Sequence, residues 1–256
     1  MGSRLRLTLG AVAVLILAGC GAAGSEEPAG QATTSASGDP VDLVGLWTVQ
    51  AAAGEEPGAI LRLAERLSLW RTCGHLHGSW QAAPDGLFLA HVYSGSDACY
   101  RSPDSVPDWL RQAAGHRADG SDRLLVDRDG RTVARLVPGG RPKVDADTAP
   151  SEGDPPVLTD ELRRWLSPAA PLPSGLQPAS EADLVGRWVR SDGAGAAAPR
   201  PPFVEVVPDG SWNGSDGCNG QGGRWISGAA GSFVALAGVR MAFPALRRDP
   251  EWTKRL

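Results

Sequence analysis

Short hydrophobic runs separated by glycine, proline and aspartate recur along the first half of the chain. The runs at 78–82 and 87–92 flank Pro84-Asp85-Gly86, in which proline sets φ and glycine accepts a positive φ. The runs at 124–127 and 132–136 flank a second turn that contains aspartate and glycine. Hydrophobic runs of this length around such turns predict antiparallel β-hairpins.

Helix signals are weaker in this half of the chain. The hydrophobic runs at 60–63 and 67–70 fit a β-hairpin with a three-residue turn, but the spacing of their apolar residues also fits one helix. A short helix is predicted from Ser105, as N-cap, to Gly115, because Asp108 stands at the position of a capping box. Several antiparallel strands and one helix are therefore expected before the last hairpin.

The chain contains an internal repeat. Asp42-Leu43-Val44-Gly45-Leu46-Trp47 returns as Asp183-Leu184-Val185-Gly186-Arg187-Trp188. Later landmarks recur in the same order: Cys73 as Cys218, Trp80 as Trp225, and the segment 85–90 as 230–235. A repeat of this length implies two tandem domains and not a solenoid of short units.

The repeat divides the chain into two modules and a linker. Module 1 spans 41–138 and module 2 spans 181–256. The linker at 139–180 is rich in proline, glycine and aspartate, and a short helix is predicted within it at 159–166. Thr159 is the expected N-cap of this helix, because acidic residues fill the turn that follows it.

Module 2 is shorter than module 1. It has no counterpart of the hairpin at 124–136, so its sheet is expected to have an unpaired edge. Asp249 and Pro250 resemble the start of a helix, with proline at the first helical position. A truncated gene, a strand supplied from elsewhere and a degenerate domain are equally compatible with this sequence.

The N-terminal residues have the pattern of a bacterial lipoprotein signal. Two arginines precede an apolar run at 7–17, which is shorter than the about 20 residues of a membrane span. The run ends in Leu17-Ala18-Gly19-Cys20, which resembles a lipobox, so 1–20 is expected to be a signal peptide and Cys20 to be lipidated. The small, polar segment 21–40 predicts a disordered tether to the outer face of the cell membrane. An ordinary secretory signal with an incidental cysteine is the alternative.

Composition narrows the classes of partner. The 256 residues carry 25 lysines and arginines against 29 aspartates and glutamates, a net charge of −4. This balance offers no basic field to a nucleic-acid backbone, which argues against a nucleic-acid partner. The 33 glycines and 21 prolines agree with many turns and some unstructured chain.

The order of these motifs resembles the META/HslJ domain family of exported bacterial proteins. The landmarks that carry the resemblance are Gly45, Trp47, Gly78, Trp80, Asp97-Ala98-Cys99, Gly186, Trp188, Gly217-Cys218-Asn219 and Trp225. The resemblance implies a mainly β (α+β) fold of two tandem antiparallel, barrel-like modules, each with one helix, and it implies no enzymatic activity. The chain departs from the family pattern at Thr72-Cys73-Gly74-His75 and at Met241-Ala242-Phe243.

Three of the four cysteines remain after Cys20. Cys73 and Cys99 both lie in module 1, and thiols oxidise readily outside the cytoplasm, so a Cys73–Cys99 disulfide is expected. Phe243 holds the position in module 2 that corresponds to Cys99, which leaves Cys218 without a partner. Cys218 is then expected to be a small buried hydrophobe, and a reactive thiol is the alternative.

Catalytic and metal-binding patterns are sparse. Cys73, His75 and His77 would share one face of a strand and suit zinc, although the disulfide competes for the thiol. No serine stands in a Gly-x-Ser-x-Gly motif, and acidic residues stand mostly in turns and tails, where solvation is expected. The repeated tryptophans are Trp47, Trp80, Trp188 and Trp225. They are expected to pack in the core, and a surface platform for carbohydrate or peptide is the alternative.

Together these features predict a non-catalytic protein of the cell envelope, attached to the membrane through a lipid on Cys20. It is expected to have no cofactor and to serve in binding or maintenance, with an envelope protein or a small apolar ligand as partner. A carrier of a small apolar ligand in a β-barrel cavity is one alternative. A zinc-dependent enzyme that uses Cys73, His75 and His77 is the other.

Overall fold

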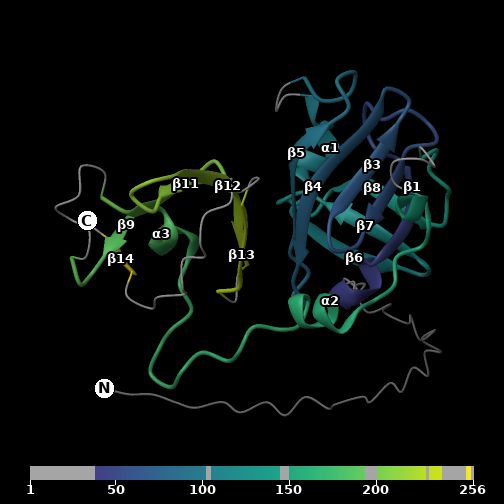
Figure 1. Cartoon of the computed structure of the whole chain (residues 1–256). Helices are drawn as coiled ribbons and strands as arrows, with labels where there is room; N and C mark the ends of the chain where they lie inside the picture. Colours follow the sequence, from purple (N-terminus) through teal and green to yellow (C-terminus); the bar gives the residue numbers. More distant parts are fainter. Residues whose placement is uncertain are drawn as a thin grey trace, which may run out of the picture. The chain divides into compact units, whose positions relative to one another are not determined.

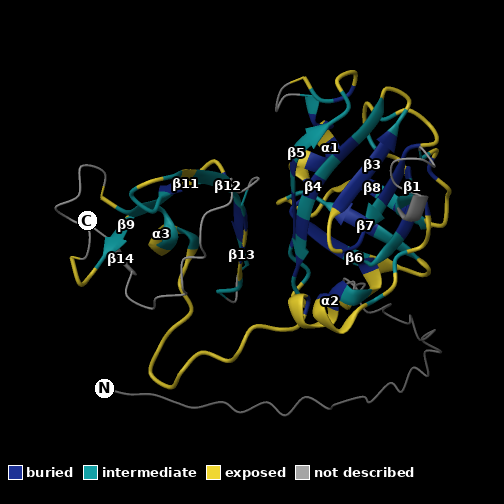
Figure 2. Ribbon diagram, viewed as in Figure 1, coloured by how far each residue is buried: buried dark blue, intermediate teal, exposed yellow. Residues whose placement is uncertain are grey.

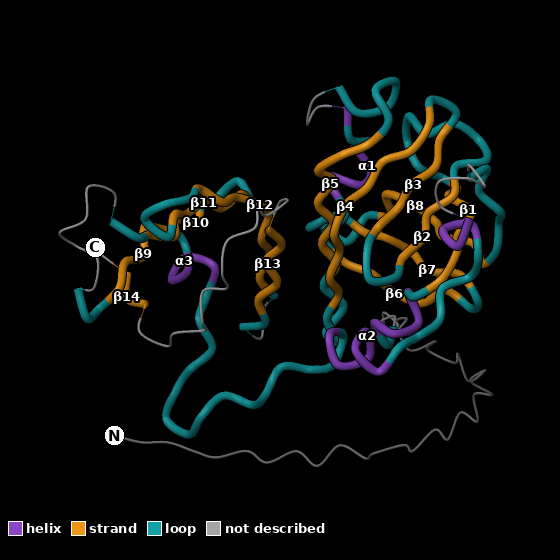
Figure 3. Tube along the Cα trace, in the orientation of Figure 1, coloured by secondary structure: helices purple, strands orange, loops and turns teal. Residues whose placement is uncertain are grey.

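The computed structural model describes residues 38–101, 105–144, 150–193, 201–228, 231–237 and, for the backbone alone, 252–254. These residues form a mainly β protein with two antiparallel sheets and only short helices, as predicted (Figures 1 and 3). The helices are η1 (Pro40–Leu43), α1 (Asp108–Gln112), η3 (Pro150–Gly153), α2 (Asp160–Trp165) and α3 (Glu181–Leu184). Within the described part of the chain, no helix has both the length and the apolar character needed to cross a membrane.

Eight strands build the first sheet. They are β1 (Gly45–Gln50), β2 (Ile60–Leu63), β3 (Leu67–Arg71), β4 (Gly74–Ala82), β5 (Phe88–Gly95), β6 (Gly115–Asp119), β7 (Asp122–Val126) and β8 (Thr132–Pro138). Neighbouring strands are hydrogen-bonded in the order β5-β4-β3-β2-β1-β8-β7-β6. The sheet therefore ends in β5 on one side and β6 on the other, and α1 lies between these two strands in the sequence.

The two edge strands meet and close this sheet into a barrel. Leu87, the residue before β5, and Gly115, the first residue of β6, form an antiparallel bridge. Beside this bridge, the His116 amide donates a hydrogen bond to the Gly86 carbonyl at 2.7 Å. This contact covers the adjoining ends of the two edge strands, which an open sheet would expose.

Side chains fill the interior of the barrel. Buried and partly exposed residues alternate along β4, so one face of the strand points inward (Figure 2). The largest fully buried side chains of the barrel include Leu43, Leu61, Leu63, Leu67, Leu69, Leu76, Phe88, Trp109, Leu110 and Leu125. An eight-stranded barrel is just wide enough for side chains to fill it, and here they form one packed hydrophobic core.

The predicted hairpins of module 1 are confirmed. The pairs β4–β5 and β7–β8 are antiparallel neighbours, and the ambiguous segment 60–70 forms the hairpin β2–β3 instead of a helix. The predicted helix is shorter than expected, because α1 ends at Gln112 and Gly115 already belongs to β6. Ser105 is not its N-cap: Pro107 takes that position, while the Ser105 hydroxyl accepts from the Arg101 amide at 3.2 Å.

Part of the predicted linker packs on the first barrel. The linker helix α2 begins after Thr159, whose hydroxyl accepts from the Leu162 amide at 3.1 Å, as the N-cap prediction requires. Leu162 and Leu166 are buried in the core of the barrel. Val144 packs on an outward-facing hydrophobic cluster of the barrel, which consists of Leu46, Ile60 and Trp70. The segment 167–180, in contrast, is exposed throughout.

The second sheet repeats the strand order of the first. Its strands β9 (Gly186–Arg190), β10 (Phe203–Val206), β11 (Ser211–Ser215), β12 (Gly220–Ser227) and β13 (Phe233–Ala237) are ordered β13-β12-β11-β10-β9. This matches the order β5-β4-β3-β2-β1 in the first sheet. The short strand β14 (Trp252–Lys254) pairs with β9, at the place where β8 pairs with β1.

Strand β14 corrects two expectations about module 2. The edge that the missing hairpin would leave unpaired is paired, because the backbone of β14 supplies hydrogen-bond partners to β9. Trp252 lies in this strand and not in a helix. Asp249 and Pro250, the expected start of that helix, lie outside the described residues.

Equivalent tryptophans make equivalent hydrogen bonds in the two sheets. In each case the indole Nε1 donates to a backbone carbonyl at a distance between 2.6 and 2.9 Å. The donor and acceptor pairs are Trp47 and Leu43, Trp188 and Leu184, Trp80 and Ala64, and Trp225 and Val207. The repeat that is visible in the sequence is therefore also a repeat of structure.

Steric and conformational constraints explain why glycine precedes these tryptophans. A Cβ on Gly78 or on Gly223 would lie closer than 3.0 Å to a carbonyl oxygen of the neighbouring strand, so glycine allows the two strands to approach. A Cβ on Gly45 would crowd the Trp47 indole at 3.2 Å. Gly186 has a φ of +130°, which other residues rarely adopt.

The two sheets contact each other through a small hydrophobic cluster. Its buried members are Leu89, Ala114, Ile226, Val234 and Leu236. Arg224 on β12 adds two hydrogen bonds, in which its guanidinium donates to the carbonyls of Ala90 at 3.0 Å and Arg111 at 2.6 Å. This apolar cluster and the Arg224 guanidinium are among the contacts between the two sheets.

His116 lies at the closure of the barrel in a poorly solvated position. It is 3% exposed, and its Nε2 atom lies 3.3 Å from the carbonyl oxygen of Ala83. Its Nδ1 atom has no hydrogen-bond partner among the described residues. Burial lowers the pKa of His116 below 6.5, and the effect is opposed by the Ala83 carbonyl and reinforced by Arg123.

We expect the free energy of unfolding to fall as the pH drops below about 6.5, because the unfolded chain then binds a proton that the buried imidazole of His116 does not. The loss continues down to the lowered pKa of the folded state. Burial also lowers the pKa of His77 and of His91, so both contribute in the same direction. Urea unfolding at about pH 8 and about pH 5 measures the slope. The His116→Gln variant should show a shallower slope, and an unchanged slope would contradict the role of this residue.

Candidate functional site

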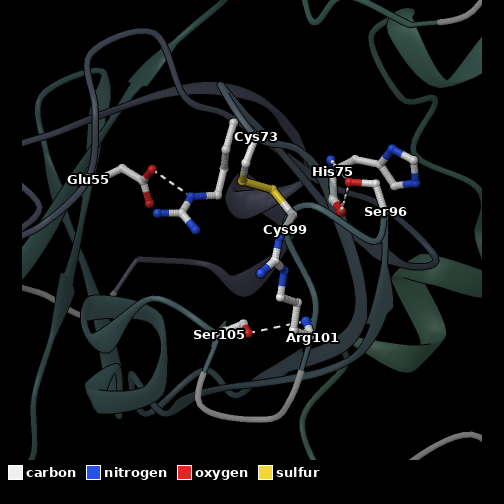
Figure 4. The surroundings of a disulfide bond; sticks show 8 residues. Glu55, Cys73, His75, Ser96, Cys99, Arg101 and Ser105 are labelled. Carbon is white, nitrogen blue, oxygen red and sulfur yellow. Dashed lines mark hydrogen bonds and ion pairs between the residues drawn. A yellow bond between two sulfur atoms is a disulfide. The ribbon is translucent and has the colours of Figure 1, made fainter.

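The best-defined cluster of chemically capable side chains surrounds the turn between β3 and β4. Cys73 in this turn forms the predicted disulfide with Cys99, and the two Cα atoms are 5.2 Å apart (Figure 4). Gly74 has a φ of +134°, which permits the sharp change of direction. The Ser96 hydroxyl accepts from the His75 amide at 3.1 Å. The disulfide and this hydrogen bond hold the turn to the segment that follows β5.

A buried carboxylate lies near the disulfide (Figure 4). Glu55 accepts a hydrogen bond from Arg71 Nε at its Oε1 atom and one from Trp109 Nε1 at its Oε2 atom, both at 2.8 Å. The Glu55 side chain is 2% exposed and the Arg71 side chain 18%. The expectation that acidic residues are solvated is wrong for Glu55, because a guanidinium and an indole N–H replace water as its partners.

The two histidines of the proposed zinc site lie together, but without a thiolate. The rings of His75 and His77 have their centroids 4.6 Å apart. Cys73 is bonded to Cys99, so its sulfur is not available as a metal ligand. The Nδ1 atom of His77 lies 3.1 Å from the Ser68 hydroxyl, and burial lowers the pKa of this imidazole. In the part of the chain that the structure describes, no group of three potential ligands is placed to hold a metal ion.

A groove of about 530 Å³ runs beside this turn. Three parts of the chain line it: Ile60 and Trp70, which are paired residues on β2 and β3, the turn residues 71–75, and the segment 141–143 after β8. We call this the disulfide-side groove. Volumes of roughly 300–1,000 Å³ are typical of small-molecule sites, so its size suits a small organic ligand.

Two glycines place the third lining segment of the groove. The Gly139 amide donates to a β1 carbonyl at 2.9 Å, and the Thr48 hydroxyl donates to the Gly139 carbonyl at 3.3 Å. Gly140 has a φ of +102°, and a Cβ there would clash with side chains of β1 and β2. These contacts hold two exposed cations, Arg141 and Lys143, at the groove.

The side chains around the disulfide-side groove carry positive charge. Arg71, Arg141 and Lys143 line it, and none of the described residues that line it is acidic. The charge of Arg71 is compensated by its ion pair with Glu55. The excess positive charge therefore comes from Arg141 and Lys143.

The corresponding turn of the second sheet has a different structure. The Asp216 carboxylate accepts from the backbone amides of Cys218 at 2.8 Å and Asn219 at 2.6 Å. Gly217, which follows Asp216, has a φ of +97°. The hydrogen bond from the Asn219 amide makes the largest contribution to lowering the pKa of Asp216, and the bond from the Cys218 amide adds to it. Cys218 is exposed, so the expectation that it is a buried hydrophobe is wrong. The carboxylate organises a tight turn at the surface, and the thiol is left in solvent.

The repeated tryptophans predicted from the sequence lie mainly in the hydrophobic core. Trp47, Trp80 and Trp225 are at most 5% exposed, as core packing requires, whereas Trp188 is only partly buried. Cys20 lies outside the described residues, and so does Phe243.

Sequence reasoning missed the residues that surround the disulfide. Glu55 lies in the loop before β2 and Arg71 ends β3, 16 positions later, and no local motif marks them as a pair. Arg141 and Lys143 flank a proline within the linker, and this short cationic group was the one available signal.

No protein-family model matches this chain, and neither does any curated protein or any solved structure. Its function is therefore inferred from its own residues.

Proposed function

We propose that the protein is a non-catalytic binding protein of the cell envelope, built of two META/HslJ-like modules and held on the outer face of the membrane by a lipid on Cys20. The observation that carries this proposal is the Cys73–Cys99 disulfide. Disulfides persist in oxidising compartments and are rare in the cytosol. A disulfide in the first module is therefore consistent with a lipobox-like sequence that ends at Cys20.

The way in which the reactive side chains are used supports binding over catalysis. The thiols of Cys73 and Cys99 are joined to each other, and the Glu55 carboxylate is occupied by Arg71 and Trp109. A catalytic acid or nucleophile must be able to reach its substrate, whereas these groups stabilise a turn. A zinc enzyme would need the thiolate of Cys73, which the disulfide removes.

The packed interior supports binding at the surface over transport of an apolar ligand inside the barrel. Phe88, Trp80 and Trp109 are each at most 3% exposed and belong to one continuous core. A carrier needs an enclosed cavity, and side chains occupy this space instead. The disulfide-side groove lies outside this core and is open to ligands.

Intact-mass spectrometry of the membrane-extracted protein tests the proposal. The wild-type protein should carry the added mass of acyl chains, and the Cys20→Ser variant should lack it, because the thiol is the acyl acceptor. Cys218→Ser is the matched control: it also removes one thiol, and it should keep the lipid mass. Wild-type protein with an unmodified Cys20, or with stoichiometric bound zinc, would contradict the proposal.

A further inference from the structure

We propose that the disulfide-side groove binds a small organic oxyanion, that is, a compound in which a phosphate or carboxylate group is attached to an apolar part. This inference rests on the proposed binding function and names the class of ligand. The structural basis is one groove in which two cations, carried by a backbone segment that the fold holds in place, lie beside an apolar surface.

The fold holds the backbone that carries the two cations in place. Arg141 and Lys143 are exposed, and Pro142 between them is buried. Proline has a fixed φ, and Gly139 and Gly140 before it are seated on β1 and β2, so little backbone freedom is lost when a ligand binds. Among the described residues, no ion pair involves Arg141 or Lys143, so their charge is available to an anion.

The apolar part of the ligand has a defined place. Ile60 and Trp70 line the groove and belong, with Leu46, to the outward-facing cluster on which Val144 packs. An apolar group beside Trp70 would extend this cluster and be removed from water. The groove volume of about 530 Å³ is larger than an inorganic anion needs and suits an organic one.

The comparison between the two modules supports a site in module 1 alone. The corresponding turn of module 2 carries the Asp216 carboxylate, whose oxygens accept from the amides of Cys218 and Asn219. A negative charge at this position would repel an oxyanion. The repeat therefore preserves the strand order, and the charge at the turn differs between the two copies.

Isothermal titration calorimetry on the full-length protein in a neutral detergent tests the proposal. The probes are phenyl phosphate, benzoate and, as the neutral counterpart, benzyl alcohol. We expect saturable binding of at least one anionic probe and none of benzyl alcohol. The Arg141→Gln/Lys143→Gln variant should bind at least about tenfold more weakly, because charge-assisted hydrogen bonds are lost. Titration with mixed micelles that contain phosphatidylglycerol, with phosphatidylcholine micelles as the control, shows whether the oxyanion is a lipid headgroup or part of a soluble compound.

A charge-matched control separates the groove from the general field of the protein. Arg163→Gln/Arg164→Gln removes two exposed cations from α2, and it should leave the affinity unchanged. Equal weakening by the two double variants, or the absence of saturable heat with every anionic probe and with phosphatidylglycerol, overturns the inference. An unchanged thermal midpoint verifies that the variants fold. None of these outcomes affects the lipid mass on Cys20, so the proposed function stands or falls separately.

Discussion

Simultaneous replacement of Cys73 and Cys99 by serine is expected to lower the free energy of unfolding by about 3 kcal/mol. The two residues are 26 positions apart, and a cross-link of this span removes conformational freedom from the unfolded chain. The folded state also depends on the bridge, because it holds the β3–β4 turn to the segment that follows β5. The turn residues 71–75 line the disulfide-side groove, so the variant should also bind anions less tightly.

Guanidinium unfolding followed by tryptophan fluorescence measures this effect. Cys218→Ser is the control for the loss of a sulfur atom, and it should change the stability by less than about 0.5 kcal/mol because Cys218 is exposed. A double serine variant with the wild-type midpoint would show that the bridge does not stabilise the barrel. Wild-type protein with a reducing agent should behave as the double variant does.

Glu55→Gln is expected to destabilise the protein by about 3 kcal/mol, because it leaves the mostly buried guanidinium of Arg71 without a counter-charge. The Glu55 side chain is 2% exposed and the Arg71 side chain 18%, so water can replace little of the lost interaction. This loss of stability lies at the lower end of the range for broken buried ion pairs, because Arg71 keeps some contact with solvent. The volume of the side chain is conserved, and no cavity contributes.

A double-mutant cycle separates this charge effect from a packing effect. Glu55→Gln/Arg71→Met should be less destabilised than the sum of its single variants, because removal of both charges leaves neither one unpaired. Glu181→Gln is the control: Glu181 pairs with Arg128 at the surface, where the side chains are 43% and 47% exposed, and should cost less than about 1 kcal/mol. Strictly additive losses in the cycle would contradict the coupling of Glu55 and Arg71.

Local signals were sufficient for the hairpins β4–β5 and β7–β8. Pro84-Asp85-Gly86 encodes its own turn, and the hydrophobic runs on either side need only each other to pair, so β4 and β5 could be predicted. The strand β6 (Gly115–Asp119) was missed because its residues contain no hydrophobic run. It is a strand because β7 supplies a partner on one side and the start of β5 completes the closure on the other.

The same distinction applies to the residues of the candidate site. Cys73 and Cys99 could be paired because module 1 contains no other cysteine. The contacts of Glu55 could not be foreseen, because Trp109, one of its two donors, lies 54 positions away. The exposure of Cys218 was not predicted, because it depends on the turn that Asp216 organises by accepting hydrogen bonds from the backbone amides.

The sequence by itself determined the internal repeat, the hairpins β4–β5 and β7–β8, the linker helix α2 and the disulfide pairing. These features depend on residues close together in the chain, or on a residue type that occurs only a few times. Only the tertiary structure decided the closure of β5 on β6, the burial of Glu55 and the placement of Arg141 and Lys143 beside the turn at Cys73. Each of these joins segments that are far apart in the chain, and only the packing of the barrel brings them together.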